Sequence, residues 1–408
     1  MKITKACDNI ILFSLYAIAF FLPISKGIIE SFSILAIIAY LIKKFSAFKD
    51  FPKSPMNYAV FAYLAACVLS IAFSANLAIS LRTLATKTLQ DIIFFFAVLE
   101  TLNEKKRIRN LLNVLFLSSL VVGIDGIYQY FTRHDFLRHR RVIFLDRIYA
   151  SFVTPNALGC YLSMIFPFLI SRFFSKFRLK FSRFAYFALF VLLFICLLLT
   201  ISRGAWLAYL ASVLFMSIWL KSLAVFLLVI GIVIVATHTF YTPYLKERLT
   251  KFSFFSDVGG MDRKFIWQAG WKMFVSRPWI GLGLVTFMFN FKKFISADYK
   301  YSASYAHNCY LQMASEIGII GLLAFLFILG SFFYRGIKDL NTKESNFYWY
   351  ILLAAQAAIL GYSMQMAVDT TIYTLDLGML FWLVLGIGGA AMKNMAAKTE
   401  GGFQSEDN

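Results

Sequence analysis

Charged side chains are scarce in this sequence of 408 residues, of which only 15% are Asp, Glu, Lys or Arg. Hydrophobic residues make up 60%, aromatic residues 18%, and the mean hydropathy is +0.72. This composition excludes a soluble domain. Apolar runs of near-spanning length recur from end to end, which predicts an all-α polytopic membrane protein. Because no linker separates these runs, we expect residues 1–397 to form one integral-membrane domain, followed by a disordered cytoplasmic tail over residues 398–408.

Cysteine, histidine and acidic residues are also few. The five cysteines show no CxxC spacing, so neither a disulfide framework nor a zinc site is expected. His134 and His139 could together approach a metal, but their arginine neighbours oppose a bound cation. The 21 acidic residues face 40 Lys and Arg, which gives a net charge of +19. Part of this excess orients the helices, and the rest predicts contact with anionic membrane lipid or an anionic substrate; no nucleic-acid partner is expected.

About twelve apolar runs are candidate membrane spans. They cover residues 8–23, 27–42, 57–73, 83–100, 108–130, 154–171, 184–201, 205–220, 222–241, 306–334, 348–367 and 375–392. With the N-terminus in the cytoplasm, most Lys-rich and Arg-rich connections fall on the inner side, which also places the C-terminus there. The first run lacks a small-x-small cleavage site, so we expect it to remain as a helix.

Three segments on the outer side break the positive-inside rule. They are the loop at 131–153, the turn at 202–204 and the long loop at about 242–305. The arginines of the first loop are Arg133, Arg138, Arg140, Arg141 and Arg147. Guanidinium groups suit bidentate contact with phosphate, so the clusters together indicate substrate binding. A solvated basic surface that faces anionic headgroups is the alternative.

Arg203 lies in a turn that joins two apolar runs with almost no connecting residues. Its charge is therefore expected at or just below the membrane surface, where an unpaired cation is costly. Gly204 and Ala205 would allow a helix or a ligand to approach closely, which favours a functional role. The alternative is that Arg203 reaches the interface beside Trp206 without binding anything.

A candidate amphipathic helix starts at Asp262 and runs to Phe274. Its apolar residues, Trp267 among them, fall roughly on one side, and Asp262 is a plausible N-cap. This pattern predicts a helix lying on the outer leaflet. Arg263 would meet an anion there together with the free backbone N–H groups of the first turn. A simple interfacial anchor explains the periodicity equally well.

His307 stands where the long loop enters a very apolar helix, which we expect to begin at residue 306. A histidine at the membrane edge can take a proton from a hydroxyl group at neutral pH. Gly318 and Gly321 lie near the same helix face, whereas Glu316 points roughly opposite and needs a polar partner inside the membrane. The alternative is a helix-end histidine that is hydrogen-bonded to a loop.

Four elements of the sequence, taken together and in their order along the chain, resemble the O-antigen ligase and polymerase superfamily of bacterial envelope glycosyltransferases. The matching pieces are the helix start Thr154-Pro155-Asn156, the turn Ser202-Arg203-Gly204-Ala205-Trp206, the stretch Arg263 to Trp267 with Pro278-x-x-Gly281-x-Gly283, and His307-Asn308-x-x-Leu311 with Glu316-x-Gly318-x-x-Gly321. Plain helix-start chemistry also explains Thr154 as a cap and Pro155 in the first turn. By motif the resemblance extends over residues 120–330.

The resemblance implies a multi-pass protein of the bacterial inner membrane that transfers sugar in the periplasm by inversion, without metal or cofactor. The donor would be a glycan on undecaprenyl pyrophosphate, and the acceptor would be a sugar hydroxyl of lipid A–core. By this match His307 would be the general base, while Arg203 and Arg263 would hold the leaving pyrophosphate. Further contacts to the donor or to lipid A phosphates would come from Arg133, Arg138, Arg140, Arg141, Asn308 and Trp267.

Several functions stay open at this point. An O-antigen ligase is favoured because a long basic loop precedes the histidine helix. A polymerase of the same superfamily would instead join two lipid-linked repeat units, and related members glycosylate pilins. A lipid-linked sugar transporter predicts charges near the bilayer midplane on broken or repeated helices, whereas the notable residues in this chain cluster at the outer face. A purely structural assembly protein is the remaining alternative.

Overall fold

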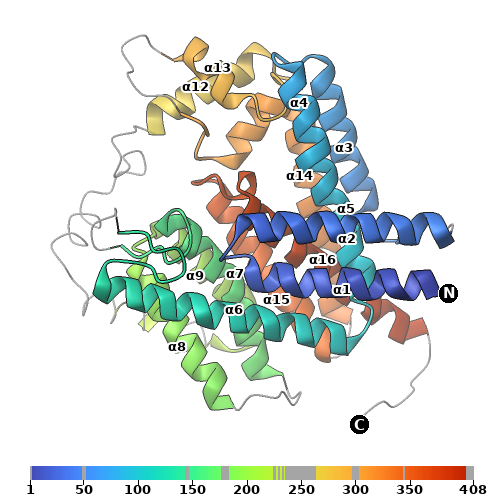
Figure 1. Ribbon diagram of the computed structural model, residues 1–408, viewed down its shortest axis with the longest axis vertical. Helices are drawn as coiled ribbons and strands as arrows, with labels where there is room; N and C mark the ends of the chain where they lie inside the picture. The colour runs from blue at the N-terminus through green and yellow to red at the C-terminus, as the bar shows by residue number, and fades with distance from the viewer. Residues whose placement is uncertain are drawn as a thin grey trace.

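A computed structural model describes residues 2–47, 52–142, 147–175, 183–223, 263–295, 303–342 and 345–400, with a few isolated positions between 227 and 234. Throughout these parts the chain is helical and forms no strand, so the predicted all-α class is confirmed. Figure 1 shows the long helices packed into one body, with α12 and α13 together at one end of it.

Long helices alternate with a few short helical turns along the chain. In chain order they are α1 (Lys2–Phe21), α2 (Lys26–Ala47), α3 (Asn57–Ala72), α4 (Leu77–Thr83), the π-helical turn η1 (Leu84–Thr88), α5 (Leu89–Thr101), α6 (Lys105–Thr132), α7 (Pro155–Phe174), α8 (Arg183–Leu199), α9 (Arg203–Trp219), α12 (Arg263–Ser276), α13 (Phe287–Phe294), α14 (Cys309–Thr342), α15 (Phe347–Met366), the 3₁₀ turn η2 (Thr371–Tyr373) and α16 (Leu375–Glu400).

Six helices in the described part are long and apolar enough to cross a membrane, namely α1, α6, α7, α14, α15 and α16. Three others, α3, α8 and α9, are apolar but have only 16 or 17 residues. Most of the expected span at 222–241 lies outside the described residues. Six of the predicted spans are thus confirmed by length and composition, whereas the full set of twelve is not. The helix α16 continues to Glu400 and so includes the first residues of the expected tail, and residues 401–408 are not described.

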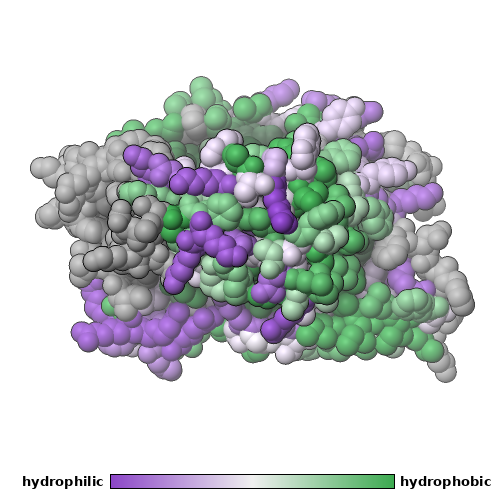
Figure 2. Space-filling model, turned by 90° about the horizontal axis from the view of Figure 1, so that it is seen from above, coloured by the Kyte–Doolittle hydropathy of each residue, from purple (hydrophilic) through white to green (hydrophobic). Residues whose placement is uncertain are grey.

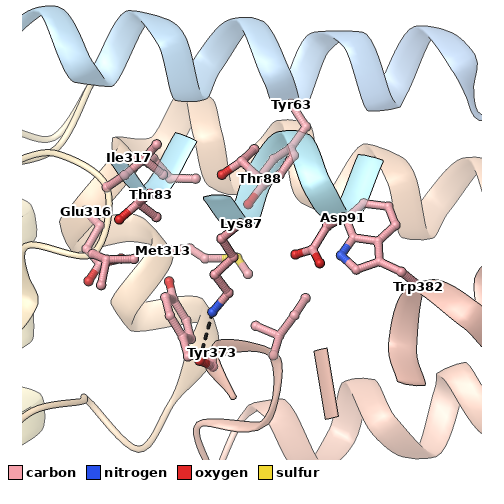
Figure 3. Close-up of a pocket in the computed structure, with 13 residues that line it drawn as sticks. Tyr63, Thr83, Lys87, Thr88, Asp91, Met313, Glu316, Ile317, Tyr373 and Trp382 are labelled. Carbon is pink, nitrogen blue, oxygen red and sulfur yellow. Dashed lines mark hydrogen bonds between the residues drawn. The ribbon is translucent and has the colours of Figure 1, made fainter. Parts of the chain in front are cut away.

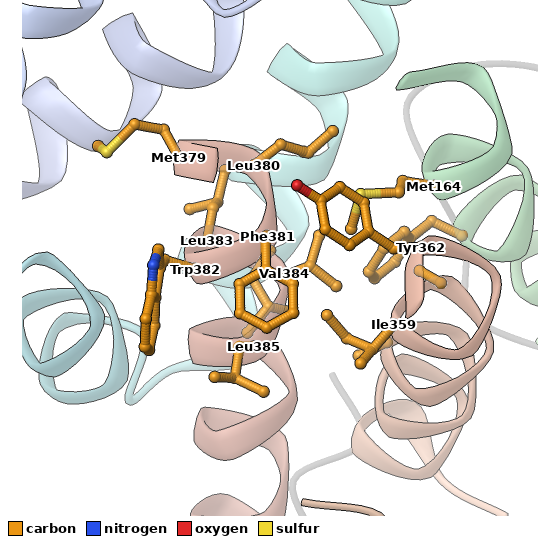
Figure 4. Packing of buried hydrophobic residues seen from close by; sticks show 14 of the residues in the cluster. Met164, Ile359, Tyr362, Met379, Leu380, Phe381, Trp382, Leu383, Val384 and Leu385 are labelled. Carbon is orange, nitrogen blue, oxygen red and sulfur yellow. The ribbon is translucent and has the colours of Figure 1, made fainter. Parts of the chain in front are cut away.

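The core of the molecule is centred on α16. Nearly all of its apolar stretch is buried, and it packs against α5, α7, α14 and α15. Aromatic rings fill the space between these helices: the Phe381 ring lies 5.3 Å from that of Tyr362 and 5.9 Å from that of Phe325, while Trp382 meets Phe95 edge to face at 6.0 Å (Figure 4). Such closely packed rings hold a helix in one position, and this fixes the connection that precedes α16.

The long helix α14 is broken at Gly318, whose φ of 68° and ψ of −174° are not helical. The segment 278–283 closes onto this break by backbone hydrogen bonds in both directions. Ile319 and Ile320 donate to the carbonyls of Pro278 and Trp279 at 2.7 and 3.3 Å, and in return the amides of residues 282 and 283 donate to the carbonyls of residues 315 and 316. The two sequence motifs that contain these residues therefore form one structural unit.

Two helices of the segment between α9 and α14, namely α12 and α13, rest on this unit. The helix α12 buries Ile266 and Met273 and leaves Trp271 58% exposed, so its apolar side is divided between the protein and the surroundings. A helix is thus present over Arg263–Ser276, where an amphipathic helix was predicted, and Asp262, its predicted N-cap, lies outside the described residues. Seen from above in Figure 2, the end of the molecule where α12 and α13 lie carries hydrophilic side chains next to apolar ones. A mixed surface of this kind suits the boundary between membrane and water.

Candidate functional site

A cavity of about 460 Å³ opens between segments that are far apart in the sequence. One wall is the start of α7, and a second wall is the connection between α15 and α16. Its charged and titratable lining residues are Lys26, Arg147, Arg263, His307, Asp369 and Asp376. The cavity therefore brings together a histidine, two arginines and two carboxylates, which is a set able to bind a polar anionic ligand and move a proton.

His307 lies at this cavity, two residues before α14 begins at Cys309. The predicted helix start at residue 306 is therefore wrong, because Asn308 acts as the cap and its side chain accepts from the Leu311 amide at 3.0 Å. His307 has a φ of 50°, an uncommon conformation for a residue with a Cβ. Backbone strain of this kind persists where the surroundings fix it, and functional sites are common examples.

The Nδ1 atom of His307 lies 3.7 Å from Oδ1 of Asp369. This separation is longer than a hydrogen bond, and the ring nitrogen makes none with the residues that the structure describes. A carboxylate on this side favours the tautomer with hydrogen on Nδ1, which leaves Nε2 able to accept a proton. The pairing of a histidine with an acid was not predicted. Its only signal in the sequence is an acidic residue in the connection at 368–374, which contains almost no positive charge.

Arg263 lines the same cavity as the first residue of α12. One turn further on, the indole Nε1 of Trp267 donates to the carbonyl of Ala306 at 3.0 Å, which ties α12 to the residue before His307. The family resemblance placed Trp267 among the ligand contacts. In the structure its indole joins the helix that carries Arg263 to the loop that carries His307, and so holds the two site residues together.

Arg203 is the first residue of α9 but does not line this cavity. Its helix start is nevertheless near the site. A Cβ added to Gly204 would lie 3.0 Å from the side chain of Val368, which precedes Asp369, and a Cβ added to Gly159 in α7 would lie 2.6 Å from that of Ala205. The small residues thus allow α7, α9 and the α15–α16 connection to meet closely, as expected from their size.

The loop before α7 supplies a further cation, Arg147, one of the loop arginines that were grouped as candidate substrate contacts. Arg147 is only 5% exposed and lines the cavity, with Nε donating to the carbonyl of Thr200 at 2.8 Å and Nη2 donating to Asn156 at 3.0 Å. Thr154 caps α7 through the Ala157 amide at 3.2 Å, and Pro155 occupies the first turn, so both predictions for this helix start are confirmed. A buried guanidinium beside a helix N-terminus is a favourable environment for an anion.

The other arginines of the 131–153 loop do not line the cavity. Arg138 donates twice to the carbonyl of Ile24, at 3.0 and 2.8 Å. Arg140 pairs with Asp135 at 3.3 Å and donates to two backbone carbonyls. Burial, and secondarily the charge of Arg140, lowers the pKa of Arg138. Arg133 and Arg141 are exposed. In this structure Arg138 and Arg140 hold the loop in place, whereas Arg133 and Arg141 face outward.

Glu316 is buried in α14, at 1% exposure. Its Oε1 accepts from the amide of Phe287, the first residue of α13, and from Nε2 of Gln312, both at 3.1 Å. The phenol of Tyr373 lies in the same small cavity as Glu316, and burial, together with the charge of Glu316, raises the pKa of that phenol. The expected polar partner is therefore Gln312, but it lies on the same helix. Glu316 caps α13 and links it to α14.

The glycines of the same motif serve packing. A Cβ at Gly318 would overlap the carbonyl of Trp279, and one at Gly321 would overlap the side chain of Ile317. Among the residues that the structure describes, no group of three or more His, Cys, Asp or Glu could hold a metal ion, and all five cysteines are free and buried.

Residues 188–326 match the family model described as O-antigen ligase. No curated protein matches the chain. The matched stretch contains Arg203, Arg263 and His307 and ends before Asp369. Members of the family are glycosyltransferase-like enzymes that act on lipid-linked glycans. The chain is thus similar to the O-antigen ligase family over residues 188–326, and its apolar spanning helices are those of a membrane protein.

Proposed function

We propose that this protein is an O-antigen ligase, which transfers a glycan from undecaprenyl pyrophosphate to a sugar hydroxyl of lipid A–core. The observation that carries the proposal is the common cavity of His307, Arg263 and Arg147. A base and fixed guanidinium groups are the two things that such a transfer requires, since the pyrophosphate is already a good leaving group. The same superfamily includes polymerases, which would use a second lipid-linked glycan as the acceptor.

In the proposed reaction the acceptor oxygen attacks the anomeric carbon of the donor sugar. The bond from that carbon to the pyrophosphate oxygen breaks, and the configuration at the carbon is inverted. His307 takes the proton of the attacking hydroxyl, with Asp369 holding the imidazole and stabilising its positive charge. Arg263 and Arg147 face the negative charge that develops on the departing pyrophosphate. Arg203, at the neighbouring start of α9, would contact the same phosphates after a modest movement.

The cations of the protein can replace a metal in this scheme, because their charge is already fixed beside the leaving group. The reaction would take place on the periplasmic side of the bacterial inner membrane, with both termini in the cytoplasm. This orientation follows from the distribution of Lys and Arg along the chain. Labelling of single cysteines introduced at exposed positions of the 131–142 loop, with a reagent that does not cross membranes, would test it.

The decisive experiment gives the purified protein a lipid-linked glycan together with either lipid A–core or a second portion of donor. We expect glycan on lipid A–core, and no product from the His307→Ala variant even though it inserts and accumulates normally. Extended lipid-linked glycan as the sole product would identify a polymerase. Transfer by His307→Ala at the wild-type rate would reject the assigned base.

A further inference from the structure

A second, smaller cavity lies behind the site, and it contains charged groups that the proposed reaction does not use. It measures about 40 Å³, which is room for about two water molecules. Lys87, Asp91, Glu316 and Tyr373 line it, and Figure 3 shows them converging from three segments of the chain. Lys87 and Asp91 belong to the expected span at 83–100. Ionisable groups at such a depth are costly and usually have a function.

The turn η2 separates the two cavities. Thr371 and Thr374 line the larger cavity, whereas Ile372 and Tyr373 line the smaller one. Asp369 belongs to the same connection between α15 and α16. One side of this connection therefore lines the site, and its other side lines the smaller cavity together with Lys87 and Glu316. A displacement on one side of so thin a partition is transmitted to the other side.

Lys87 holds this partition directly. Its Nζ donates to the carbonyl of Tyr373 at 2.8 Å and lies 5.2 Å from the centre of the Tyr373 ring (Figure 3). Lys87 is part of the π-helical turn η1, and π-turns are common where a side chain must be aimed out of the regular helical register. Asp91 lines the same cavity and faces Lys87, so a carboxylate is available there to balance the charge of Lys87.

The histidine side of the site is joined to the same cluster. The amide of Ala306 donates to Oε1 of Gln312 at 3.0 Å, and Nε2 of Gln312 donates to Glu316 at 3.1 Å. Glu316 and Tyr373 line the same small cavity. Two hydrogen bonds thus connect the residue before His307 with Glu316, which shares this cavity with the turn that follows Asp369.

We infer that Lys87 is a positioning residue, which together with Glu316 and Tyr373 sets the distance between His307 and Asp369. The inference rests on the proposed function for its kinetic consequence. At 3.7 Å the imidazole and the carboxylate are just beyond hydrogen-bonding distance, so a small shift of η2 decides whether they bond. Lys87 touches no ligand in this scheme and acts only through the turn it holds.

The test uses the double variant Lys87→Met/Asp91→Asn, which removes both charges and leaves the cavity filled by side chains of similar size. We expect its kcat to fall about ten- to a hundredfold, since misplacement by about 1 Å has effects of this size. The KM for undecaprenyl-pyrophosphate-linked glycan should stay within about twofold, because the arginines of the site are unchanged.

Lys43→Met is the matched control. It removes a buried lysine that pairs with Asp8 and Glu100 at the other end of α5, about 20 Å along the helix.

A second experiment, in which Asp369 is also replaced, distinguishes a positioning role of Lys87 from a general loss of stability. In an Asp369→Asn background the Lys87→Met/Asp91→Asn change should lower kcat by no more than about twofold. Hydrogen–deuterium exchange of the peptide 368–376 gives a readout that does not depend on transfer, and it should become faster in the Lys87 variant but not in Lys43→Met. An equal kcat loss in both backgrounds, or unchanged exchange of this peptide, would overturn the inference. If the wild-type protein transfers no glycan, the proposed function is rejected. The hydrogen–deuterium exchange experiment then still tests whether Lys87 holds the turn η2 in position.

Discussion

Replacing Gly318 with alanine should strongly destabilise the connection between α14 and the segment 278–283. The glycine has a φ of 68°, and a Cβ there would overlap the carbonyl of Trp279. The overlapping atom belongs to backbone, so no side chain can move aside to relieve it. The segment 278–283 must then move away from the break in α14.

The magnitude follows from two contributions. Holding an alanine at a φ of 68° and a ψ of −174°, a combination that essentially only glycine adopts, costs about 1–3 kcal/mol. Moving the segment away weakens the hydrogen bonds that Ile319 and Ile320 donate, at 2.7 and 3.3 Å, and each is worth about 1 kcal/mol net. We therefore expect Gly318→Ala to lower the free energy of unfolding by about 3–5 kcal/mol. Because α12 ends just before this segment, Arg263 should also move relative to His307, and glycan transfer should fall with stability.

Gly330 in the same helix is the matched control, because a Cβ added there would meet nothing within 4 Å. The Gly330→Ala variant should be neutral or more stable by up to about 1 kcal/mol. Unfolding of both variants by denaturant titration in detergent micelles measures the difference directly. Equal unfolding free energies for the two variants would refute the reasoning, because they would show that neither the φ value nor the contact with Trp279 constrains residue 318.

Three further predictions concern the cations. Arg203→Lys should lower kcat/KM by at least about tenfold, or about 1.4 kcal/mol, because a point charge does not replace a planar fork; wild-type activity would argue against bidentate phosphate binding. Arg138→Met should destabilise the protein by about 1–3 kcal/mol through the lost bonds to Ile24, yet leave the donor KM within about twofold, and a large rise in KM would instead make Arg138 a ligand contact. Transfer by the purified protein should be unchanged by EDTA if fixed guanidinium groups supply the positive charge, and loss of activity that Mg²⁺ restores would contradict this.

Much of the fold could be predicted from local patterns. Apolar length identified α1, α6, α7 and the last three long helices, and turn chemistry identified the cap Thr154 and the first-turn Pro155. These features depend on residues that are close in the sequence. The predicted number of twelve spans was not confirmed. Helices such as α3 are apolar enough to be read as spans from the sequence, but α3 has only 16 residues and is shorter than the helices that are long enough to cross a membrane.

The site was predictable only in part, because its geometry is tertiary. Arg263 and His307 share a cavity as expected, but the partner of His307 comes from the connection between two later helices. Nothing near His307 in the sequence indicates Asp369. Likewise the sequence shows that Arg138 and Arg147 are charged, but only the fold shows that Arg138 bonds Ile24 while Arg147 lines the cavity.

Glu316 illustrates how a motif residue can serve the site without entering it. An acid beside a candidate base suggests catalysis, yet its carboxylate caps α13 through Phe287 and accepts a hydrogen bond from Gln312 of its own helix. Tyr373, from the turn near Asp369, lines the same small cavity. An uncharged glutamine at position 316 could keep the bond from Phe287 but would weaken the electrostatic attraction to each donor. The arrangement of a base, two carboxylates and two arginines in one cavity thus depends on a further carboxylate buried behind it, because segments from distant parts of the chain need a fixed anchor to meet.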